Sequence, residues 1–263
     1  MAEQAAQLRV EQPTDAVPPI EAVPPIEAVI FDWGGTLTPW HPIDPHEQWL
    51  AYARVYDAHG AQALATRLRA AEDAAWAAAR DHHHSTSLAT ILASAGVQPE
   101  GALHEEALVA FESGWERHTF TDPEAVPLIV ALRARGLRIG ILSNTVWERA
   151  HHERVLARDG VLQLVDGAVY SSEISWTKPH PEAFLAATAA VGVSDPARVV
   201  FVGDRPFDDI HGAGAVGMRT ILVPHSDIPV EQRGHTDGEP DAVAHRLSDV
   251  LAIVDGWLSR SVR

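Results

Sequence analysis

Short apolar runs rich in β-branched residues recur along the chain, and each run ends at small or polar residues. The runs occupy residues 28–31, 138–142, 167–170, 199–202 and 219–223. Runs of this length and composition are typical of strands that are buried on both faces of a sheet. Helical patterns lie between the later runs, at 123–135, 147–158, 181–191 and 208–216. Strands that alternate with helices predict an α/β fold with a Rossmann-like, doubly wound parallel sheet.

A longer helical stretch interrupts this alternation between the first and second predicted strands. Patterns rich in Ala, Leu, Arg and Glu occur at 49–55, 61–80, 87–95 and 105–117. They predict an inserted all-helical cap over residues 40–122, placed to close on a substrate and exclude water. The predicted core then comprises residues 27–39 and 123–263. Residues 1–26 contain repeated Pro-Pro steps, which favour extended chain, and we expect them to form a disordered tail.

Composition excludes several classes of function. The net charge of −16 would repel nucleic acids and anionic membranes, so neither is an expected partner. The chain has no cysteine, which excludes disulfides and thiolate catalysis. No run reaches the ~18 consecutive apolar residues of a membrane span. Residues 1–26 lack the basic and apolar regions of a secretory signal, so the expected location is the cytoplasm.

Four short segments with polar residues follow the predicted strands or stand just beyond them. They are FDWGGTLT (31–38), ILSNT (141–145), TKPHPEAF (177–184) and VGDRPFDDI (202–210). Ligands of open parallel sheets bind at the carboxyl ends of the strands, where Asp32, Ser143 and Asp204 are expected. In this order and on these elements, the segments resemble the four-motif signature of the haloacid dehalogenase-like (HAD) hydrolase superfamily, of the phosphatase type with a helical C1 cap. The resemblance extends from Ala28 to the C-terminus.

The resemblance implies a role for each of these polar residues. Asp32 would be the nucleophile that forms an aspartyl-phosphate, and a carboxylate can do so when a bound Mg²⁺ offsets its repulsion for a phosphate. Lys178, the only lysine in the chain, would pair with Asp32 and with the transferred group. The implied metal ligands are Asp32, the Gly34 carbonyl, Asp204 and Asp209, and the implied phosphate-binding residues are Ser143, Asn144, Lys178 and Gly35. Spacing alone does not separate Asp208 from Asp209.

One position departs from the phosphatase pattern. The residue two after the nucleophile is usually a second Asp that protonates the leaving group, and here it is Gly34. Losing a positioned general acid typically costs ~10² to 10⁴ in rate. One interpretation is a phosphatase whose substrate has a good leaving group, such as an acyl, anomeric or enol phosphate. Another is that the proton comes from water or from a cap residue.

Other activities of the superfamily fit the sequence less well. A phosphonoacetaldehyde hydrolase would need a cap lysine for its Schiff base, and residues 40–122 contain none. A haloacid dehalogenase also lacks the second Asp, but it attacks carbon without a metal and would not need the GDxxxxD segment from Gly203 to Asp209. A catalytically weak or inactive phosphate-binding protein is the remaining alternative. The best-supported prediction is a Mg²⁺-dependent phosphatase of a small phosphorylated metabolite.

Several other polar and aromatic residues could contribute to the site. His41, Asp44 and His46 stand at the entrance of the predicted cap and are candidates for substrate contact or for a replacement proton donor. Trp33 and Trp40 flank the predicted site and either line an apolar part of the substrate pocket or brace the hinge. The remaining cap tryptophans are expected to pack between helices; these are Trp49, Trp76 and Trp115.

Overall fold

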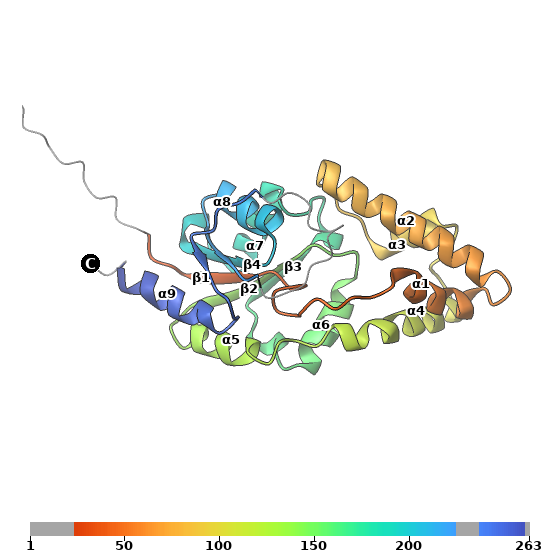
Figure 1. Ribbon diagram of the computed structural model, residues 1–263, viewed down its shortest axis with the longest axis horizontal. Helices are drawn as coiled ribbons and strands as arrows, with labels where there is room; N and C mark the ends of the chain where they lie inside the picture. Colours follow the sequence, from red (N-terminus) through yellow and green to blue (C-terminus); the bar gives the residue numbers. More distant parts are fainter. Residues whose placement is uncertain (1–23, 225–236, 261–263) are drawn as a thin grey trace, which may run out of the picture.

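A computed structural model describes residues 24–224 and 237–260, and nearly all of the predicted Pro-rich tail (1–26) lies outside that range. The described chain contains one fully parallel sheet with the strand order β3-β2-β1-β4-β5-β6 (Figure 1). The predicted α/β class and its five strands are confirmed. The strands are β1 (Ala28–Phe31), β2 (Arg138–Ser143), β3 (Gly167–Tyr170), β4 (Val199–Gly203), β5 (Arg219–Leu222) and the unpredicted two-residue β6 (Ala242–Val243).

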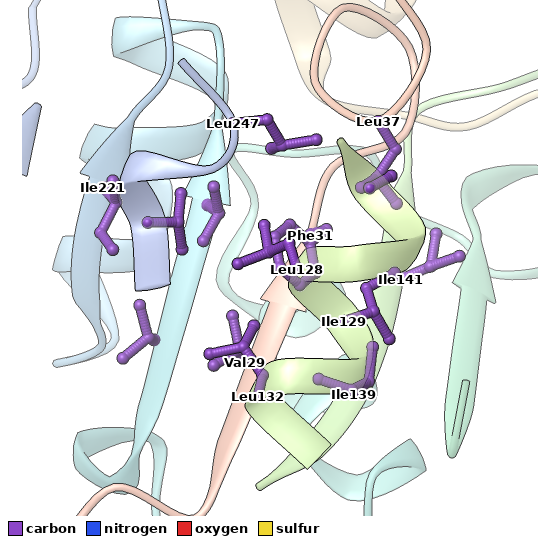
Figure 2. Close-up of a cluster of buried hydrophobic side chains, with 14 of the residues drawn as sticks. Val29, Phe31, Leu37, Leu128, Ile129, Leu132, Ile139, Ile141, Ile221 and Leu247 are labelled. Carbon is purple, nitrogen blue, oxygen red and sulfur yellow. The ribbon is translucent and has the colours of Figure 1, made fainter. Parts of the chain in front are cut away.

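Helices cover both faces of the sheet (Figure 1). Along β1, the side chains of Val29 and Phe31 join one buried cluster, while Ala28 and Ile30 join another on the opposite face. Figure 2 shows the first cluster, in which β1 and β2 side chains meet Leu128, Ile129 and Leu132 of α5. The helices of this part are α5 (Ala125–Arg133), α6 (Arg149–Arg158), α7 (Pro181–Ala190), α8 (Gly212–Ala215) and α9 (Asp249–Arg260), with the short turns η2 (Leu162–Leu164), η3 (Ser171–Glu173) and η4 (Pro196–Arg198).

The helix predicted over 208–216 differs from the one observed. The segment begins as a π-helical turn, η5 (Pro206–His211), and only then becomes the four-residue α8. The Asp209 carboxylate accepts a hydrogen bond from the Arg205 amide at 2.9 Å, which fixes the start of the turn. π-turns are uncommon and occur often at functional sites. The irregular turn therefore marks the segment that carries Asp208 and Asp209.

Between β1 and α5 the chain forms a group of helices beyond one end of the sheet (Figure 1). We call the segment 45–118 the helical insertion; it comprises α1 (Pro45–Tyr56), α2 (Ala61–His82), α3 (Leu88–Ser94), α4 (Ala102–Trp115) and η1 (Glu116–His118). Its start follows from local chemistry, because Asp44 caps α1 by accepting a hydrogen bond from the His46 amide at 2.9 Å, and Pro45 suits the first turn.

The helical insertion has its own buried cluster, separate from the two clusters on the sheet. Trp49 and Tyr52 of α1, Leu68 of α2 and Phe111 of α4 belong to it, and so does Val146 from the loop after β2. The predicted division into a cap at 40–122 and a core remains a prediction, to which this separate cluster gives support. None of the described helices is both long enough and apolar enough to cross a membrane.

Candidate active site

The strand order brings three of the predicted residues to one edge of the sheet. Asp32 directly follows β1, Ser143 ends β2 and Asp204 directly follows β4. Since β1 lies between β2 and β4, Asp32 stands between the other two. All three side chains are buried. The parallel strands therefore bring together three polar side chains that are far apart in the sequence.

Lys178 reaches this edge from the loop between β3 and α7 and is 4% exposed. Its Nζ donates to Asp32 Oδ1 at 2.5 Å and to Asp209 Oδ1 at 2.7 Å. Burial alone would lower the pKa of the ammonium group, but Asp209 and Asp32 outweigh it and the pKa is raised. Lys178 therefore stays charged and joins the two carboxylates into one network.

Asn144 supports the lysine rather than facing open space. Its Nδ2 donates to the Lys178 carbonyl at 3.0 Å, and its Oδ1 accepts from the Lys178 amide at 2.8 Å. The nitrogen and the oxygen of the Asn144 side chain are thus both hydrogen-bonded to the backbone of Lys178. The predicted contact of Asn144 with a phosphate would require the amide to serve in addition to this role, and it stays a prediction.

Asp204 differs from its neighbours because neither of its carboxylate oxygens has a hydrogen-bond partner among the described residues. It is 3% exposed. Burial, followed by repulsion from Asp32 and Asp209, raises its pKa well above the usual value. Burial likewise raises the pKa of Asp32 to about 6, although Lys178 opposes the shift. A buried carboxylate without a partner is costly in the absence of a counter-ion.

The residues present fit a divalent cation. One oxygen from each of Asp32, Asp204 and Asp209 can be chosen so that all three lie within 4.8 Å of one another. Around them, four carboxylates (Asp32, Asp204, Asp208, Asp209) interact with only two permanent cations, Lys178 and Arg205. The surplus of negative charge is two, and oxygen donors of this kind are the ligands that Mg²⁺ prefers.

Two glycines make this close packing possible. Gly35 has a φ of +101°, and a Cβ built there would lie 2.2 Å from Asp204 Oδ2. A Cβ on Gly203 would lie 2.4 Å from the side chain of Asp209. Any larger residue at either position would displace a carboxylate of the site. These glycines are therefore required by the neighbouring carboxylates, and at Gly35 by the backbone as well.

Of the two adjacent carboxylates on η5, the structure brings Asp209 into the network. Asp209 is fully buried and contacts Lys178, whereas the side chain of Asp208 is 29% exposed and lies 3.7 Å from Arg205. The role of Asp209 as a metal ligand stays a prediction, since its two oxygens already accept from Lys178 and from the Arg205 amide.

The loop after Asp32 is held by two backbone hydrogen bonds. The Gly35 amide donates to the Thr38 carbonyl at 2.7 Å, and the Thr38 amide donates to the Trp33 carbonyl at 2.9 Å. Neither bond uses the Gly34 carbonyl, the predicted metal ligand. The Gly35 amide, predicted to bind phosphate, is engaged within the loop, so a phosphate would have to share or replace that bond.

Gly34, the position of the missing acid, has free space around it. Apart from its chain neighbours, no atom of the described residues lies within 4 Å of a Cβ built there. The φ of Gly34 is not positive, so its backbone conformation is open to residues other than glycine. The absence of a second Asp is thus not imposed by crowding.

A cavity of about 100 Å³ lies beside this loop. It is lined by residues of the segment 33–43, by Trp115 and His118 at the end of the helical insertion and Thr119 just after it, and by Trp147 and His151 beyond β2. Trp33, Trp40 and His41 thus lie where the sequence suggested a pocket. Asp44 instead caps α1, and His46 hydrogen-bonds Gln62 at 3.3 Å.

Sequence reasoning missed part of this site. It expected Trp115 only to pack between cap helices, and it gave no role to His118, Trp147, His151 or Arg205. These four aromatic residues (Trp115, His118, Trp147 and His151) lie about 80 to 120 positions beyond Gly34 in the chain, so no local pattern joins them to the loop after Asp32. Arg205 could have been found, because it stands between Asp204 and Asp208 in the fourth motif.

Comparison with known proteins agrees with the geometry. A family model described as haloacid dehalogenase-like hydrolase matches residues 26–217. Glyceraldehyde 3-phosphate phosphatase of Methanopyrus kandleri is 28% identical over 176 residues, which are 65% of this chain and 72% of that enzyme. Phosphatase MT3486 of Mycobacterium tuberculosis is 36% identical over 135 residues, 51% of this chain and 56% of that protein.

Among solved structures, the 2-haloacid dehalogenase of Pseudomonas syringae pv. Tomato DC3000 resembles this chain with a TM-score of 0.62 and 25% identity, covering 88% of this chain and 99% of that one. Proteins named for phosphate esters and proteins named for carbon–halogen bonds therefore share this architecture. The choice between the two chemistries depends on the side chains at the strand ends.

Proposed function

Because the chain belongs to the haloacid dehalogenase-like hydrolase family, we propose that it is a Mg²⁺-dependent phosphatase of a small phosphorylated metabolite, with Asp32 as its nucleophile. The observation that carries the proposal is the carboxylate of Asp204, buried beside Asp32 and Asp209 without a hydrogen-bond partner in the described chain. A dehalogenase that works without a metal has no use for such a group. The phosphatase names of the two relatives support the same choice.

The proposed metal ligands are Asp32, the Gly34 carbonyl, Asp204 and Asp209. When bound there, Mg²⁺ would offset the repulsion between the Asp32 carboxylate and an anionic phosphoryl group. Asp209 also holds Lys178, whose ammonium group lies 2.5 Å from Asp32 Oδ1. Lys178 thereby fixes the orientation of the nucleophile and presents positive charge to the phosphoryl oxygens.

In the proposed reaction, the free oxygen of Asp32 attacks phosphorus, and the bond to the leaving oxygen breaks with its electron pair. The Ser143 hydroxyl, at the end of the neighbouring strand, donates to a phosphoryl oxygen. Water then attacks the aspartyl-phosphate, which releases phosphate and restores Asp32. Because Gly34 has no side chain, the leaving group departs without a carboxylic acid from that position.

The helical insertion is proposed to act as the cap of this enzyme, with the core formed by residues 27–39 and 123–263. Backbone hydrogen bonds hold it against the core on two sides of the site. The Leu88 amide donates to the Val146 carbonyl at 2.7 Å, and the Thr177 amide donates to the His83 carbonyl at 2.9 Å. A cap in this place would exclude water during phosphoryl transfer. A cytoplasmic location is part of the proposal.

The test measures phosphate release from a panel of phosphate esters and acyl phosphates, with and without Mg²⁺. Asp32→Asn should lower kcat/KM by about 10³-fold or more, because the amide cannot form the covalent intermediate. Asp195→Asn is the matched control, since Asp195 is an exposed cap of η4 that precedes β4 and lies at the other end of that strand. Its rates should equal those of wild type.

Two results would overturn the proposal in favour of the alternatives. Metal-independent release of chloride from 2-chloropropionate, without phosphatase activity, would identify a dehalogenase. Binding of Mg²⁺ and inorganic phosphate, measured by calorimetry, with no turnover of any ester would identify a phosphate-binding protein. Equal activity of wild type and Asp32→Asn would remove the nucleophile from the mechanism.

A further inference from the structure

The cavity beside Gly34 is lined by residues without permanent charge. None of them is Asp, Glu, Lys or Arg. Of its three histidines, His118 has a pKa lowered by burial and by Arg117, and His151 Nδ1 lies 3.3 Å from Glu112 Oε1, so any charge on His151 is already matched within the protein. A carboxylate or ammonium group on the leaving group would therefore lose its hydration here without gaining a counter-charge.

Aromatic rings form the walls of the cavity. Trp33, Trp40, Trp115 and Trp147, half of the eight tryptophans in the chain, line it. Trp147 is fixed from both sides, because it stacks on His151 with centroids 4.1 Å apart and on Phe111 at 5.0 Å. Trp115 meets Trp147 edge to face at 6.0 Å. Rigid flat walls of this kind favour a planar ring over a flexible polyol.

Several hydrogen-bond donors on these lining residues have no partner in the described chain. Trp33 Nε1, Trp115 Nε1 and Thr38 Oγ1 are buried without a partner. His118 Nε2 accepts from Arg117 Nε at 3.1 Å, so the proton of the neutral ring is on Nδ1, which also has no partner in the described chain. Buried indole N–H groups usually have an acceptor. The missing acceptors are expected on the ligand.

From these observations we infer that the leaving group is an uncharged planar ring with acceptor atoms on its edge, so that the substrate is an aryl phosphate, the phosphate ester of a phenol or of a hydroxylated heteroaromatic ring. The inference rests on the proposed phosphatase function and names its substrate class. It also accounts for Gly34. A phenolate is a far better leaving group than an alkoxide and departs with the electron pair of the P–O bond, so it needs no acid at that position.

In this reaction the groups around the cavity stabilise the departing aryl oxygen. As the P–O bond breaks and the bond from Asp32 to phosphorus forms, negative charge develops on the aryl oxygen next to the open space at Gly34. The unpartnered N–H donors of the lining residues would stabilise that charge without giving up a proton. The phenolate then takes its proton from water after release.

The first experiment separates ring recognition from leaving-group reactivity by measuring binding alone. Phenylphosphonate and cyclohexylphosphonate share the same charged end and a similar size, but only the first has a planar ring. Both are assayed as inhibitors of Mg²⁺-dependent acetyl phosphate hydrolysis. We expect phenylphosphonate to bind about tenfold more tightly, the effect of one good aromatic contact. Equal inhibition constants would overturn the inference.

The second experiment compares kcat/KM for phenyl phosphate and cyclohexyl phosphate. The phenyl ester should be hydrolysed about 10²-fold faster or more, because the cyclohexyl ester requires the missing acid. Trp115→Leu should lower the phenylphosphonate preference to near one, and Trp115→Phe should retain part of it. Trp76→Leu is the control, since Trp76 is 38% exposed on α2 and does not line the cavity.

The outcomes keep the two proposals distinct. If Asp32-dependent hydrolysis of acetyl phosphate occurs but the aryl compounds have no advantage, the substrate class is wrong and the phosphatase stands. If no phosphate compound is hydrolysed, acetyl phosphate included, the proposed function itself fails. If Trp115→Leu does not fold, as judged by circular dichroism, the phosphonate comparison on the wild-type protein decides the matter.

Discussion

The two ends of the candidate site differ in charge: one is a cluster of charged side chains and the other is aromatic and carries no permanent charge. At the strand ends, Asp32, Lys178, Asp204 and Asp209 concentrate charge in a buried network, and most of the polar atoms there have a partner. Beyond Gly34, the cavity is aromatic and carries no permanent charge, and several of its polar atoms have no partner in the described chain. We call these the acidic end and the aromatic end.

The residues proposed to carry the reaction and those proposed to select the substrate come from different parts of the chain. The acidic end comes from loops of the sheet, whose positions are fixed by strand order and register. The aromatic end is shared between the loop after Asp32, the helical insertion and the segment after β2. Under the proposed function, substitutions at the aromatic end would change substrate selection without altering the charged residues at the strand ends.

The largest expected effect comes from neutralising the acidic end. Asp204→Asn should lower Mg²⁺-dependent turnover by about 10³-fold or more, because it removes a proposed metal ligand. The metal-free variant should nevertheless be more stable than metal-free wild type, since it no longer buries a charge without a partner. Thermal unfolding with and without Mg²⁺ checks this, and a metal-induced rise in Tm that survives the substitution would contradict it.

A smaller effect on kcat/KM is expected from a substitution at Gly34, which lies between the acidic end and the aromatic end. Gly34→Asp places the missing acid in space that the structure leaves open, so it should fold as wild type does. Its kcat/KM on cyclohexyl phosphate should rise about 10- to 100-fold, while that on phenyl phosphate should change little. Gly34→Asn controls for size and should give no gain. A gain that is equal on both esters would show that the aromatic end does not select by leaving group.

The smallest effect is a pH dependence of the metal-free protein. Burial raises the pKa of Asp32 from 3.8 to about 6, and burial also raises the pKa of Asp204 well above its usual value. A carboxylic acid with a raised pKa binds its proton more tightly in the folded state, so its contribution to stability is lost as pH rises above about 4. Metal-free wild type should therefore lose about 2 to 5 °C in Tm relative to Asp204→Asn between pH 5 and pH 7.5.

Groups that do not interact with Asp204 are common to both proteins and cancel in the difference, whereas Asp32, whose charge repels that of Asp204, contributes to the gap together with it. A Tm gap that is constant with pH would show that Asp204 is not ionised at a cost. Added Mg²⁺ should reverse the gap at pH 7.5, because the ion binds only where the carboxylate is present.

The sheet was predictable from sequence because each strand is a continuous apolar run that ends at polar or small residues. Strand bounds agree within one residue, as for 138–142 against Arg138–Ser143. α9 was missed, although Val250 and Val254 are spaced for one buried face of a helix. The helix at 208–216 was expected to be regular, but Pro206 and the hydrogen bond from Arg205 to Asp209 open it with a π-turn.

The residues of the acidic end could also be predicted from sequence, because each belongs to one of the four motifs. Three of these motifs adjoin a strand, and the motif with Lys178 begins just before α7. The structure adds the contacts of these residues. Asn144 hydrogen-bonds the Lys178 backbone, and Asp209 rather than Asp208 accepts a hydrogen bond from the Lys178 ammonium group. The aromatic end could not be predicted. Its membership depends on how α4 and the loop after β2 pack, and packing between distant segments leaves no pattern in a single sequence.

The loop after β2 has a mechanical consequence for the enzyme. Val146 lies in the buried cluster of the helical insertion, and its carbonyl accepts a hydrogen bond from the Leu88 amide. Asn144, two residues earlier, hydrogen-bonds the Lys178 backbone. The insertion cannot swing away as a rigid body with its cluster intact unless this short tether follows. If the insertion moved away from the core, Val146 and Asn144 would move with it, so that access to the aromatic end and the position of Lys178, the proposed catalytic lysine, would change together.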